Sequence, residues 1–376
     1  MGAGPETGRR PLRALLAGGG SGGHVFPALA VGAELARRGW AVDYAGAAGG
    51  MEARLVGERG LPFHPLPARP LVGRGLVDRL RALVTLALSA LSARRLLRRL
   101  GAGVVIGTGG YVSAPALLGA ALARRPALLV EPNASAGVAN RWLSRWAKEA
   151  AVAWESTGAA LSCPAVLTGV PVRREFSQLG AWMPQPGPLR LLVLGGSQGS
   201  AELNGALPAA LAALGDDARG LRVVHQAGDG KAEATRRAYA VAGVDGVEVV
   251  GFIREVALAM GEADLVVSRA GAITTAELCA AGRAALLVPL AVEAGGHQVA
   301  NARALADAGA ALWVAGGDGV ERRLAAALGD LLAARERLAG MAAAARAQAR
   351  PDAAAVIADR AERLAGGAVP AERRAA

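Results

Sequence analysis

Residues 15–30 read "LLAGGGSGGHVFPALA", a short apolar run that ends in a glycine turn and continues as a helix-like segment. Gly18, Gly20 and Gly23 fit the pattern G-x-G-x-x-G. Asp43 follows about twenty residues later, where a dinucleotide-binding fold keeps its ribose-binding acid. A strand, a glycine turn and a helix together predict an α/β domain. The turn is a candidate site for NAD or for another ligand that carries phosphate.

The same arrangement recurs in the second half of the chain. "PLRALLAGGGSGG" begins at Pro11 and "PLRLLVLGGSQGS" begins at Pro188, and each is followed by a helix-like run. A weaker repeat relates "VVIGTGGYVSAP" from Val104 to "LVVSRAGAITTA" from Leu265. The repeat predicts two similarly built halves, each with glycine turns at the carboxyl ends of its strands.

Each half alternates apolar strands with helices, which is typical of parallel sheets covered on both faces. We therefore predict the α/β fold class, with two Rossmann-like domains facing a cleft. The expected N-terminal domain covers residues 9–168 and the C-terminal domain 169–349, and a helix at about 350–366 packs back on the first domain. Strands are expected at 13–17, 41–45, 104–106, 127–130, 150–153 and 165–167, and then at 190–194, 222–226, 247–250, 265–267, 284–288 and 311–314.

The composition limits the classes of partner. The 376 residues are 53% hydrophobic and 19% charged, which excludes a disordered chain. A net charge of +11 attracts anions such as phosphates and anionic lipids. Aromatic residues make up only 3%, which argues against stacking platforms for nucleic acid, so no nucleic-acid partner is expected. Cys163 and Cys279 lack metal-ligand spacing, and no Asp-x-Asp run lies near the glycine turns, so no protein-held metal is expected.

The second half carries two glycine turns suited to phosphate. One spans residues 195–199, and the other is followed by Thr274 and Thr275, whose hydroxyls can donate to a phosphate at the start of a helix. Glu277 follows one turn inside that helix, where its carboxylate can accept both hydroxyls of a ribose. These features favour a nucleotide bound by the second half.

The first glycine turn differs because His24 follows it directly. A helix N-terminus disfavours the charged imidazolium, so a histidine there stays neutral, as a general base must. An NAD enzyme would have one cofactor domain and one differently built catalytic domain, whereas both halves here carry glycine turns. Asp43, in "WAVDYAG", is also expected inside a strand rather than at its end. An NAD-dependent oxidoreductase nevertheless stays an alternative on pattern alone.

Seven motifs together resemble the MurG family, and they run in order through nearly the whole chain: "GGGSGGHVFPALAVGAEL", "GTGGYVSAPALLGA", "EPNASAGVANRWL", "GVPVR", "LGGSQGSAELN", "SRAGAITTAEL" and "GGHQVANARAL". The resemblance implies the GT-B glycosyltransferase fold. It also implies an inverting transfer of GlcNAc from UDP-GlcNAc to the 4-hydroxyl of MurNAc in lipid I (undecaprenyl-pyrophosphoryl-MurNAc-pentapeptide). The product would be β-1,4-linked lipid II for peptidoglycan synthesis. Three alternatives remain: a related transferase with another lipid or soluble acceptor, the NAD-dependent oxidoreductase, and a nucleotide-binding protein of the membrane surface without enzymatic activity.

The resemblance also assigns roles to single residues. His24 is the first candidate for the catalytic base and Glu131 the second. No cofactor is implied, although dissolved Mg²⁺ would assist by neutralising phosphate. The implied acceptor residues are Gly19, Gly20, Tyr111 and Ser113. The implied donor residues are Ser21, Gly22, Gly23, Asn133, Arg173, Ser197, Gln198, Ile253, Ala272, Ile273, Thr274, Glu277, His297 and Gln298.

Residues 76–100, "LVDRLRALVTLALSALSARRLLRRL", are apolar in the middle and basic at the end. The apolar part is too short to span a bilayer. It is either a helix that packs on its own sheet with a solvated basic end, or an interfacial patch in which each arginine adds about 1 kcal/mol at an anionic leaflet. Because lipid I is anchored in the membrane, we expect a peripheral protein at the cytoplasmic face of the cell membrane, in contact with its anionic surface.

Overall fold

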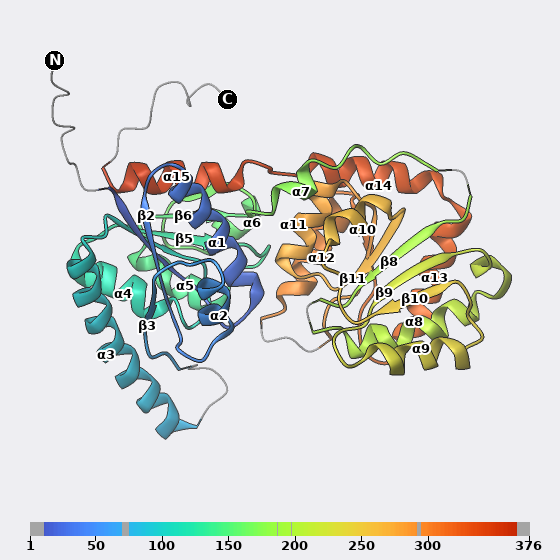
Figure 1. The fold of residues 1–376 in the computed structure, drawn as a ribbon, viewed down its shortest axis with the longest axis horizontal. Coiled ribbons are helices and arrows are strands. Elements are labelled where there is room, and N and C mark those ends of the chain that lie inside the picture. Colours follow the sequence, from blue (N-terminus) through green and yellow to red (C-terminus); the bar gives the residue numbers. More distant parts are fainter. Residues whose placement is uncertain (1–10, 70–74, 186, 197, 292–294, 367–376) are drawn as a thin grey trace, which may run out of the picture. The chain divides into compact units, whose positions relative to one another are not determined.

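The computed structural model describes residues 11–69, 75–185, 187–196, 198–291 and 295–366, which fall into two compact units. The first unit takes the chain up to residue 132, residues 136–171 and the chain from residue 352 onward. The second unit takes residues 133–135 and 172–351. Each unit is an α/β domain with its own sheet and core (Figure 1).

The described part of the first unit contains a seven-stranded parallel sheet in the order β3-β2-β1-β4-β5-β6-β7. In the central strand, Leu15 pairs with Asp43 on one side and with Val105 on the other. The strands are β1 (Arg13–Ala17), β2 (Ala41–Gly46), β3 (Phe63–Pro65), β4 (Val104–Gly107), β5 (Ala127–Glu131), β6 (Glu149–Val152) and β7 (Ala165–Leu167). The edge strand β3 was not predicted, because its sequence FHP contains no apolar run.

Helices cover both faces of this sheet, as its continuously apolar strands require. Successive side chains of β1 point to opposite faces, so Leu16 packs in the core covered by α1 and α15, and Leu15 packs in the core covered by α3, α4 and α5. The helices are α1 (Gly22–Arg37), α2 (Met51–Gly57), α3 (Leu76–Leu100), α4 (Ala114–Ala123), α5 (Val138–Leu143), the 3₁₀ turn η1 (Ser144–Trp146), α6 (Glu155–Gly158) and α15 (Ala353–Leu364).

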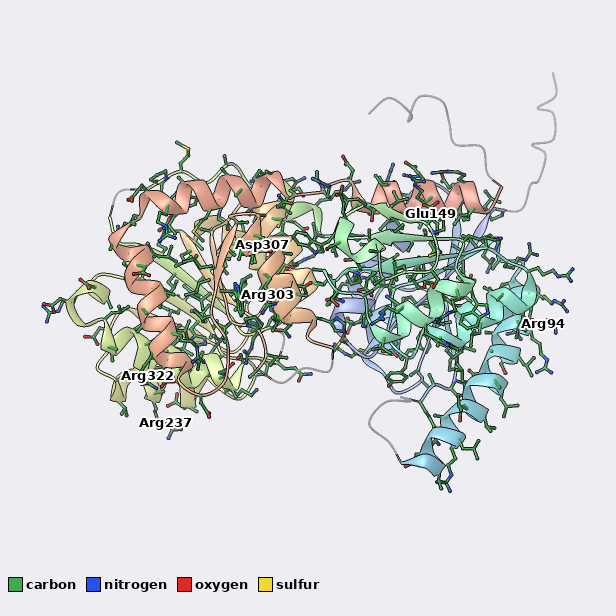
Figure 2. All side chains as sticks on the ribbon, turned by 180° about the vertical axis from the view of Figure 1, so that it is seen from behind. Arg94, Glu149, Arg237, Arg303, Asp307 and Arg322 are labelled. Carbon is green, nitrogen blue, oxygen red and sulfur yellow. The ribbon has the colours of Figure 1, made fainter. Side chains whose placement is uncertain are left out.

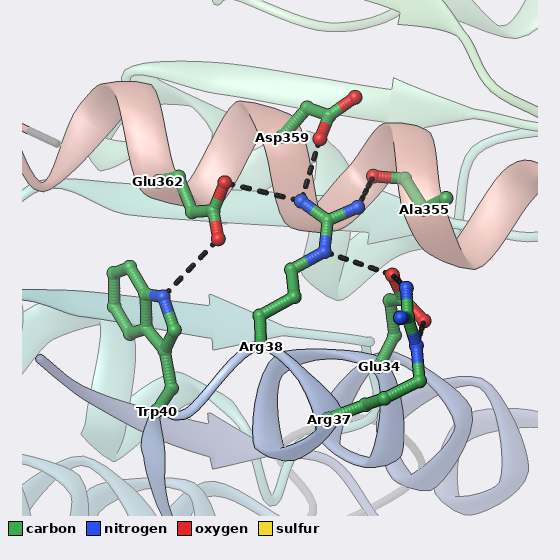
Figure 3. A network of polar contacts seen from close by, with 7 residues as sticks. All are labelled: Glu34, Arg37, Arg38, Trp40, Ala355, Asp359 and Glu362. Carbon is green, nitrogen blue, oxygen red and sulfur yellow. Dashed lines mark hydrogen bonds and ion pairs between the residues drawn. The ribbon is translucent and has the colours of Figure 1, made fainter. Parts of the chain in front are cut away.

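The last helix, α15, is held on α1 by a buried ionic network (Figure 3). Arg38, only 4% exposed, donates to Glu34 of its own helix and to Asp359 and Glu362 of α15, over 2.8, 2.5 and 3.1 Å. The indole of Trp40 donates to the other oxygen of Glu362 at 3.2 Å. One guanidinium thus joins α15 to an element more than three hundred residues earlier in the chain.

The described part of the second unit has a six-stranded parallel sheet in the order β10-β9-β8-β11-β12-β13. Its strands are β8 (Arg190–Leu194), β9 (Arg222–Gln226), β10 (Val247–Val250), β11 (Leu265–Ser268), β12 (Ala285–Leu287) and β13 (Ala311–Trp313). Its helices are α7 (Arg174–Ser177), α8 (Ala201–Ala213), the 3₁₀ turn η2 (Gly215–Ala218), α9 (Ala232–Val241), α10 (Val256–Glu262), α11 (Ala272–Ala281), α12 (His297–Asp307), α13 (Val320–Ala333) and α14 (Glu336–Ala347).

The internal repeat is visible in the two sheets. β1 lies between β2 and β4, and β8 lies between β9 and β11, so the two strands introduced by Pro-Leu-Arg occupy equivalent places. The strands of the weaker repeat also occupy equivalent places, since β4 lies next to β1 and β11 lies next to β8. The predicted fold class, two Rossmann-like α/β domains with parallel sheets, is confirmed.

Candidate active site

The first glycine turn connects β1 to α1 and is built by close backbone approaches. Gly20 has a φ of +83°, a conformation that favours glycine. A Cβ atom on Gly18 would lie 2.0 Å from Oγ1 of Thr108, and one on Gly19 would lie 2.5 Å from Oε1 of Glu52. The next residues, 21–23, are exposed or half-buried at the N-terminus of α1. The turn therefore presents backbone to a ligand only at Gly20 and beyond.

His24 lies in the first turn of α1 and is oriented by the turn after β4. Its Nδ1 is 2.8 Å from the carbonyl oxygen of Thr108. A carbonyl only accepts hydrogen bonds, so Nδ1 carries the proton and Nε2 is the basic nitrogen. Gly109 and Gly110 have φ of +103° and +74°, and a Cβ on Gly109 would lie 2.9 Å from the imidazole. The glycines of "GTGG" therefore make room for the ring.

Glu131 ends β5 and is almost completely buried. Its Oε2 accepts hydrogen bonds from the backbone N–H of Gly137 at 2.8 Å and from the side-chain amide of Asn140 at 2.9 Å. The same amide lies 3.1 Å from the position of a Cβ on Gly109, so Glu131, Asn140 and the His24 turn form one cluster. Because fixed donors hold the buried carboxylate and the His24 ring is half-buried, the geometry favours His24 over Glu131 as the base.

The other two predicted acceptor residues differ in exposure. Tyr111 is 39% exposed, and its ring lies 3.8 Å from the position of a Cβ on Gly20, so it borders the first glycine turn. Ser113 is fully buried, and its hydroxyl donates to the carbonyl of Gly110 at 2.9 Å. The Ser113 side chain therefore shapes the turn that holds His24.

Asp43 is not placed to bind a ribose. It lies inside β2 and is 2% exposed. Its carboxylate accepts hydrogen bonds from Arg13 at 2.8 Å and from Nε2 of His64 at 2.7 Å. Both carboxylate oxygens of Asp43 accept hydrogen bonds within the protein. The dinucleotide-binding pattern therefore has no acidic residue here that could bind a ribose.

Glu52 is a site residue that the sequence analysis missed. It is fully buried in α2, and its carboxylate accepts hydrogen bonds from the backbone N–H groups of Ala47, at 3.0 Å, and of Gly20, at 3.4 Å. It thus ties the first glycine turn to the segment after β2. The sequence did contain a signal for Glu52, because it is an acidic residue at the start of a helix-like segment that follows a stretch of small residues. The first turn of a helix favours acidic side chains.

The second glycine turn follows β8. Gly199 has a φ of +69°, and a Cβ there would lie 1.8 Å from the carbonyl oxygen of Ala227, so only glycine fits. Ser200 caps α8 by accepting a hydrogen bond from the N–H of Leu203 at 3.2 Å. Gln198 has an exposed side chain, and its carbonyl accepts from Lys231 at 2.8 Å. The predicted donor residue Ser197 lies outside the described residues.

The third turn joins β11 to α11. Thr275 is buried, and its hydroxyl donates to the carbonyls of Gly271 and Ala272 at 3.2 and 3.0 Å. The prediction that Thr275 donates to a phosphate is therefore wrong, whereas Thr274 is half-buried. The described residues provide α11 with no side-chain cap, so its first N–H groups, including that of Ile273, are suited to an anion.

Glu277 and Arg173, predicted separately, lie together. Arg173 Nη2 is 3.4 Å from Oε1 of Glu277, and the guanidinium lies 4.9 Å from the ring centre of Phe176. The Glu277 side chain is 14% exposed and that of Arg173 is 52% exposed. Burial raises the pKa of Glu277 to about 7, against the opposing effect of Arg173. The pair thus places a carboxylate with a shifted pKa one turn inside α11.

Residues 133–135 group with the second unit because Asn301 of α12 holds them there. The buried Asn301 amide donates to the side chain of Asn133 at 3.2 Å and to the carbonyl of Ala270 at 3.0 Å. His297 Nδ1 lies 3.1 Å from the carbonyl oxygen of Ser135. Asn301 was missed, although a polar residue four positions after His297 on a helix was a usable signal.

The last two predicted donor residues lie in loops or at a helix start of the second unit. Gln298, in the first turn of α12, accepts a hydrogen bond from the backbone N–H of Leu290 at 3.3 Å. Ile253 is half-buried in the segment between β10 and α10. Both lie after carboxyl ends of strands, where α/β sheets bind ligands.

Within the described ranges, no three His, Cys, Asp or Glu side chains gather closely enough to hold a metal ion. No helix among the described residues is long and apolar enough to cross a membrane. The C-terminal part of α3 is buried through Ala93, Leu96 and Leu97. Its earlier part exposes six apolar side chains by 39–64%: Val77, Leu80, Leu83, Val84, Leu88 and Leu91.

Comparison with known proteins assigns the class. Residues 14–152 match the family model described as the glycosyltransferase family 28 N-terminal domain, and residues 190–357 match the glycosyltransferase family 28 C-terminal domain. Solved structures with the same fold include the calicheamicin glycosyltransferase CalG4, which has a TM-score of 0.66 and 20% sequence identity and covers 96% of this chain and 100% of its own. The fold and the glycine-turn sites therefore define a two-domain glycosyltransferase.

More similar relatives specify the family. The chain is 45% identical to the UDP-N-acetylglucosamine–N-acetylmuramyl-(pentapeptide) pyrophosphoryl-undecaprenol N-acetylglucosamine transferase of Sorangium cellulosum, covering 92% of this chain and 86% of the relative. It is also 45% identical to the transferase of the same name from Acidithiobacillus ferrooxidans, covering 94% and 98%. The crystal structure of Acinetobacter baumannii MurG superposes with a TM-score of 0.79 at 36% identity, covering 94% of this chain and all of the other. The chain belongs to the MurG family, and nothing in these comparisons supports the NAD-dependent alternative.

Proposed function

We propose that this chain transfers GlcNAc from UDP-GlcNAc to the 4-hydroxyl of MurNAc in lipid I, and so forms lipid II for peptidoglycan synthesis. The observation that carries the proposal is the 45% identity over 92% of the chain to a transferase named for this reaction. The site supports it, because His24 has its proton on Nδ1 and the second unit has an anion-suited turn beside Glu277.

The second unit would bind the donor. As the glycosidic bond breaks, negative charge builds on the diphosphate, and the N-termini of α8 and α11 supply fixed N–H donors for it. Glu277 would accept the ribose hydroxyls, and the backbone of Ile253 would contact uracil. His297 and Gln298 would contact the GlcNAc hydroxyls. Arg173 would neutralise Glu277 and hold it in place, since the two already form an ion pair.

The first unit would bind the acceptor and supply the base. His24 Nε2 takes the proton of the 4-hydroxyl while the oxygen bonds to the anomeric carbon, and the bond to phosphate breaks with its electron pair leaving on UDP. Base catalysis of this kind contributes roughly 10²–10⁴-fold. Gly20 and Tyr111 would border the acceptor diphosphate. A single displacement on the face opposite UDP inverts the anomeric centre and gives the β-1,4 link.

No cofactor enters this scheme. Backbone N–H groups and helix N-termini provide the stabilisation of the leaving diphosphate that a metal provides in other transferases. Dissolved Mg²⁺ bound by UDP would add to it by neutralising phosphate charge. Activity that persists with a chelator present, and rises moderately with Mg²⁺, would agree with this part of the proposal.

The working place would be the cytoplasmic face of the cell membrane. The exposed apolar side chains of α3 can enter the interface between headgroups and acyl chains, and the basic end of the helix carries Arg95, Arg98 and Arg99 at the surface. Each arginine near an anionic leaflet adds about 1 kcal/mol. The protein would thus reach its membrane-anchored acceptor as a peripheral protein.

The proposal is tested by acceptor-dependent release of UDP. The full chain is incubated with UDP-GlcNAc, with and without a lipid I analogue, and UDP and the sugar product are both measured. We expect UDP release only with the analogue, one product per UDP, and no reaction when UDP-glucose replaces UDP-GlcNAc. Thermal stabilisation by NAD but not by UDP-GlcNAc, or transfer to another acceptor only, would contradict it.

A further inference from the structure

The core of the second unit contains a histidine that the proposed reaction does not use. His225 of β9 is fully buried, and Tyr239 of α9 and Asn204 of α8 are buried beside it. The hydroxyl oxygen of Tyr239 lies 2.8 Å from Nδ1 of His225, and Oδ1 of Asn204 lies 3.0 Å from Nε2. Two positions before Tyr239, the exposed Arg237 lies on the outer side of α9 (Figure 2), so Tyr239 points into the unit. Three elements of the unit therefore meet at one polar cluster.

The carbonyl of Ala227 sets the direction of every hydrogen bond in this cluster. Nδ2 of Asn204 is 2.9 Å from that carbonyl oxygen, which only accepts, so the amide nitrogen faces it and Oδ1 faces His225. Since Oδ1 also only accepts, Nε2 of His225 carries the proton and Nδ1 accepts from the hydroxyl of Tyr239. Burial lowers the pKa of His225 to about 4, so the ring is neutral near pH 7 and carries a single proton. The donors therefore form one directed chain from Tyr239 to Ala227.

The end of this chain lies against the second glycine turn. A Cβ on Gly199 would lie 1.8 Å from the Ala227 oxygen, and a Cβ on Gly228 would lie 2.5 Å from the carbonyl oxygen of Gln198. The N–H of Ala227 donates to the carbonyl of Val250 at 2.9 Å, so this part of the backbone is also held from its other side. Gly199 directly precedes the N-cap residue of α8. A shift of the Ala227 carbonyl would therefore move the end of the turn and the first N–H groups of α8.

Packing alone does not require polar side chains at this place in the core. The two residues paired with His225 in the sheet are Val193 of β8 and Val249 of β10, and both belong to the apolar core of the unit. A buried imidazole, amide or phenol is unfavourable unless its hydrogen bonds are made. Here they are made, and the backbone group at which they end is the carbonyl beside the glycine turn. This arrangement points to a role for the chain at that turn.

We propose that Tyr239 and His225 are positioning residues for the diphosphate of the donor nucleotide. They act through Asn204 and the Ala227 carbonyl, which hold the end of the second glycine turn and the N–H groups at the start of α8 in the geometry that the diphosphate requires. Because both side chains are buried, neither contacts the donor itself. The inference rests on the proposed function, since it needs the diphosphate at α8, but it depends neither on the acceptor nor on the base.

Titrations of the full chain with UDP and with uridine test the proposal, because the two ligands differ only in the diphosphate. In Y239F the donor to Nδ1 is lost, so the His225 ring can exchange its tautomer and the amide of Asn204 is no longer held in one orientation. The Kd for UDP should rise about 10-fold, as expected when one hydrogen bond is lost, and the Kd for uridine should change less than about 2-fold.

Two substitutions of His225 separate positioning from core stability. Glutamine can place its amide N–H where Nε2–H of the imidazole lies, whereas asparagine is shorter and reaches only the place of Nδ1. H225Q should therefore keep the Kd for UDP within about 3-fold of the unmodified chain, and H225N should raise it about 10-fold. W182F is the matched control, because it removes the indole donor to Asp264, which lies just before β11 at the opposite end of the sheet. It should lower the unfolding free energy and leave the Kd for UDP unchanged.

The outcomes distinguish this inference from the proposed function. If the unmodified chain binds UDP no more tightly than uridine, the diphosphate site at α8 is wrong, and the positioning role with it. If it binds UDP more tightly and Y239F keeps that difference, only the positioning role is wrong. Equal weakening of UDP and uridine binding in H225N, or equal loss in H225Q and H225N, would show a purely structural role and overturn the inference. Thermal unfolding of each variant checks that it folds.

Discussion

Replacing Glu277 with Gln should stabilise the fold and weaken donor binding at the same time. Burial raises the pKa of Glu277 to about 7 in the folded chain, from an ordinary value of 4.5. The folded protein therefore keeps this proton between pH 4.5 and 7, where the unfolded chain releases it. Since unfolding releases a proton in this window, the carboxylate destabilises the fold increasingly as the pH rises through it.

The size of the effect follows from the two pKa values. A pKa difference of one unit corresponds to 1.36 kcal/mol, so the rise in the pKa of Glu277 from 4.5 to about 7 corresponds to a loss of about 3 kcal/mol in unfolding free energy. This loss is complete just above pH 7. The side chain is only 14% exposed, so solvent screens little of it. Glutamine carries no charge, so E277Q should equal the unmodified chain at pH 4 and exceed its unfolding free energy by about 3 kcal/mol at pH 8.

Denaturant unfolding at several pH values measures this difference, and E248Q, at an exposed carboxylate of the same unit, is the control. Donor affinity is measured on the same proteins by titration with UDP-GlcNAc at pH 8. Exchanging a charged acceptor for a neutral one should weaken binding about 10-fold, since hydrogen bonds to charged groups are stronger by about 1.4 kcal/mol. A stability difference that does not grow with pH would refute the burial argument, and unchanged donor affinity would refute the ribose role.

Three other predictions concern the base, the C-terminal helix and the membrane patch. H24A should lower kcat by roughly 10²–10⁴-fold while UDP-GlcNAc still binds, and a near-normal kcat across pH would rule out this base. R38A leaves the buried carboxylate of Glu362 and the half-buried carboxylate of Asp359 without their arginine and should reduce the unfolding free energy by about 3–5 kcal/mol, whereas R54A, at an exposed pair, should cost less than about 1 kcal/mol. Equal losses in the two would contradict the buried network. L83S/L88S should weaken vesicle binding at least about 10-fold without lowering thermal stability, because both side chains are exposed, and unchanged flotation would exclude this patch.

The sequence predicted the sheets well because buried parallel strands are continuous apolar runs. The central strands and their glycine turns were located from the repeat that begins at Pro11 and Pro188. β3 was missed because an edge strand of three residues, one of them Pro65, has no such run. Arg173 and Glu277 were each predicted as donor residues from the resemblance, but their contact with each other depends on how α11 packs against the segment before α7.

Residues that act through long-range hydrogen bonds could not be located from the sequence. Glu52 contacts Gly20 across 32 positions, and Asn301 contacts Asn133 across 168. No local pattern records such contacts. Thr275 was assigned wrongly for a different reason, since a hydroxyl in the first turn of a helix donates either to a ligand or back to its own carbonyls, and only the structure shows which.

The structure of the sugar product tests the central claim most directly. The chain is incubated with UDP-GlcNAc and a lipid I analogue, and the purified product is examined by NMR for the coupling at the new anomeric carbon and for the position of the new bond. The account predicts one GlcNAc in β linkage to the 4-oxygen of MurNAc. An α linkage, a bond to another oxygen, or free GlcNAc as the only product would contradict it.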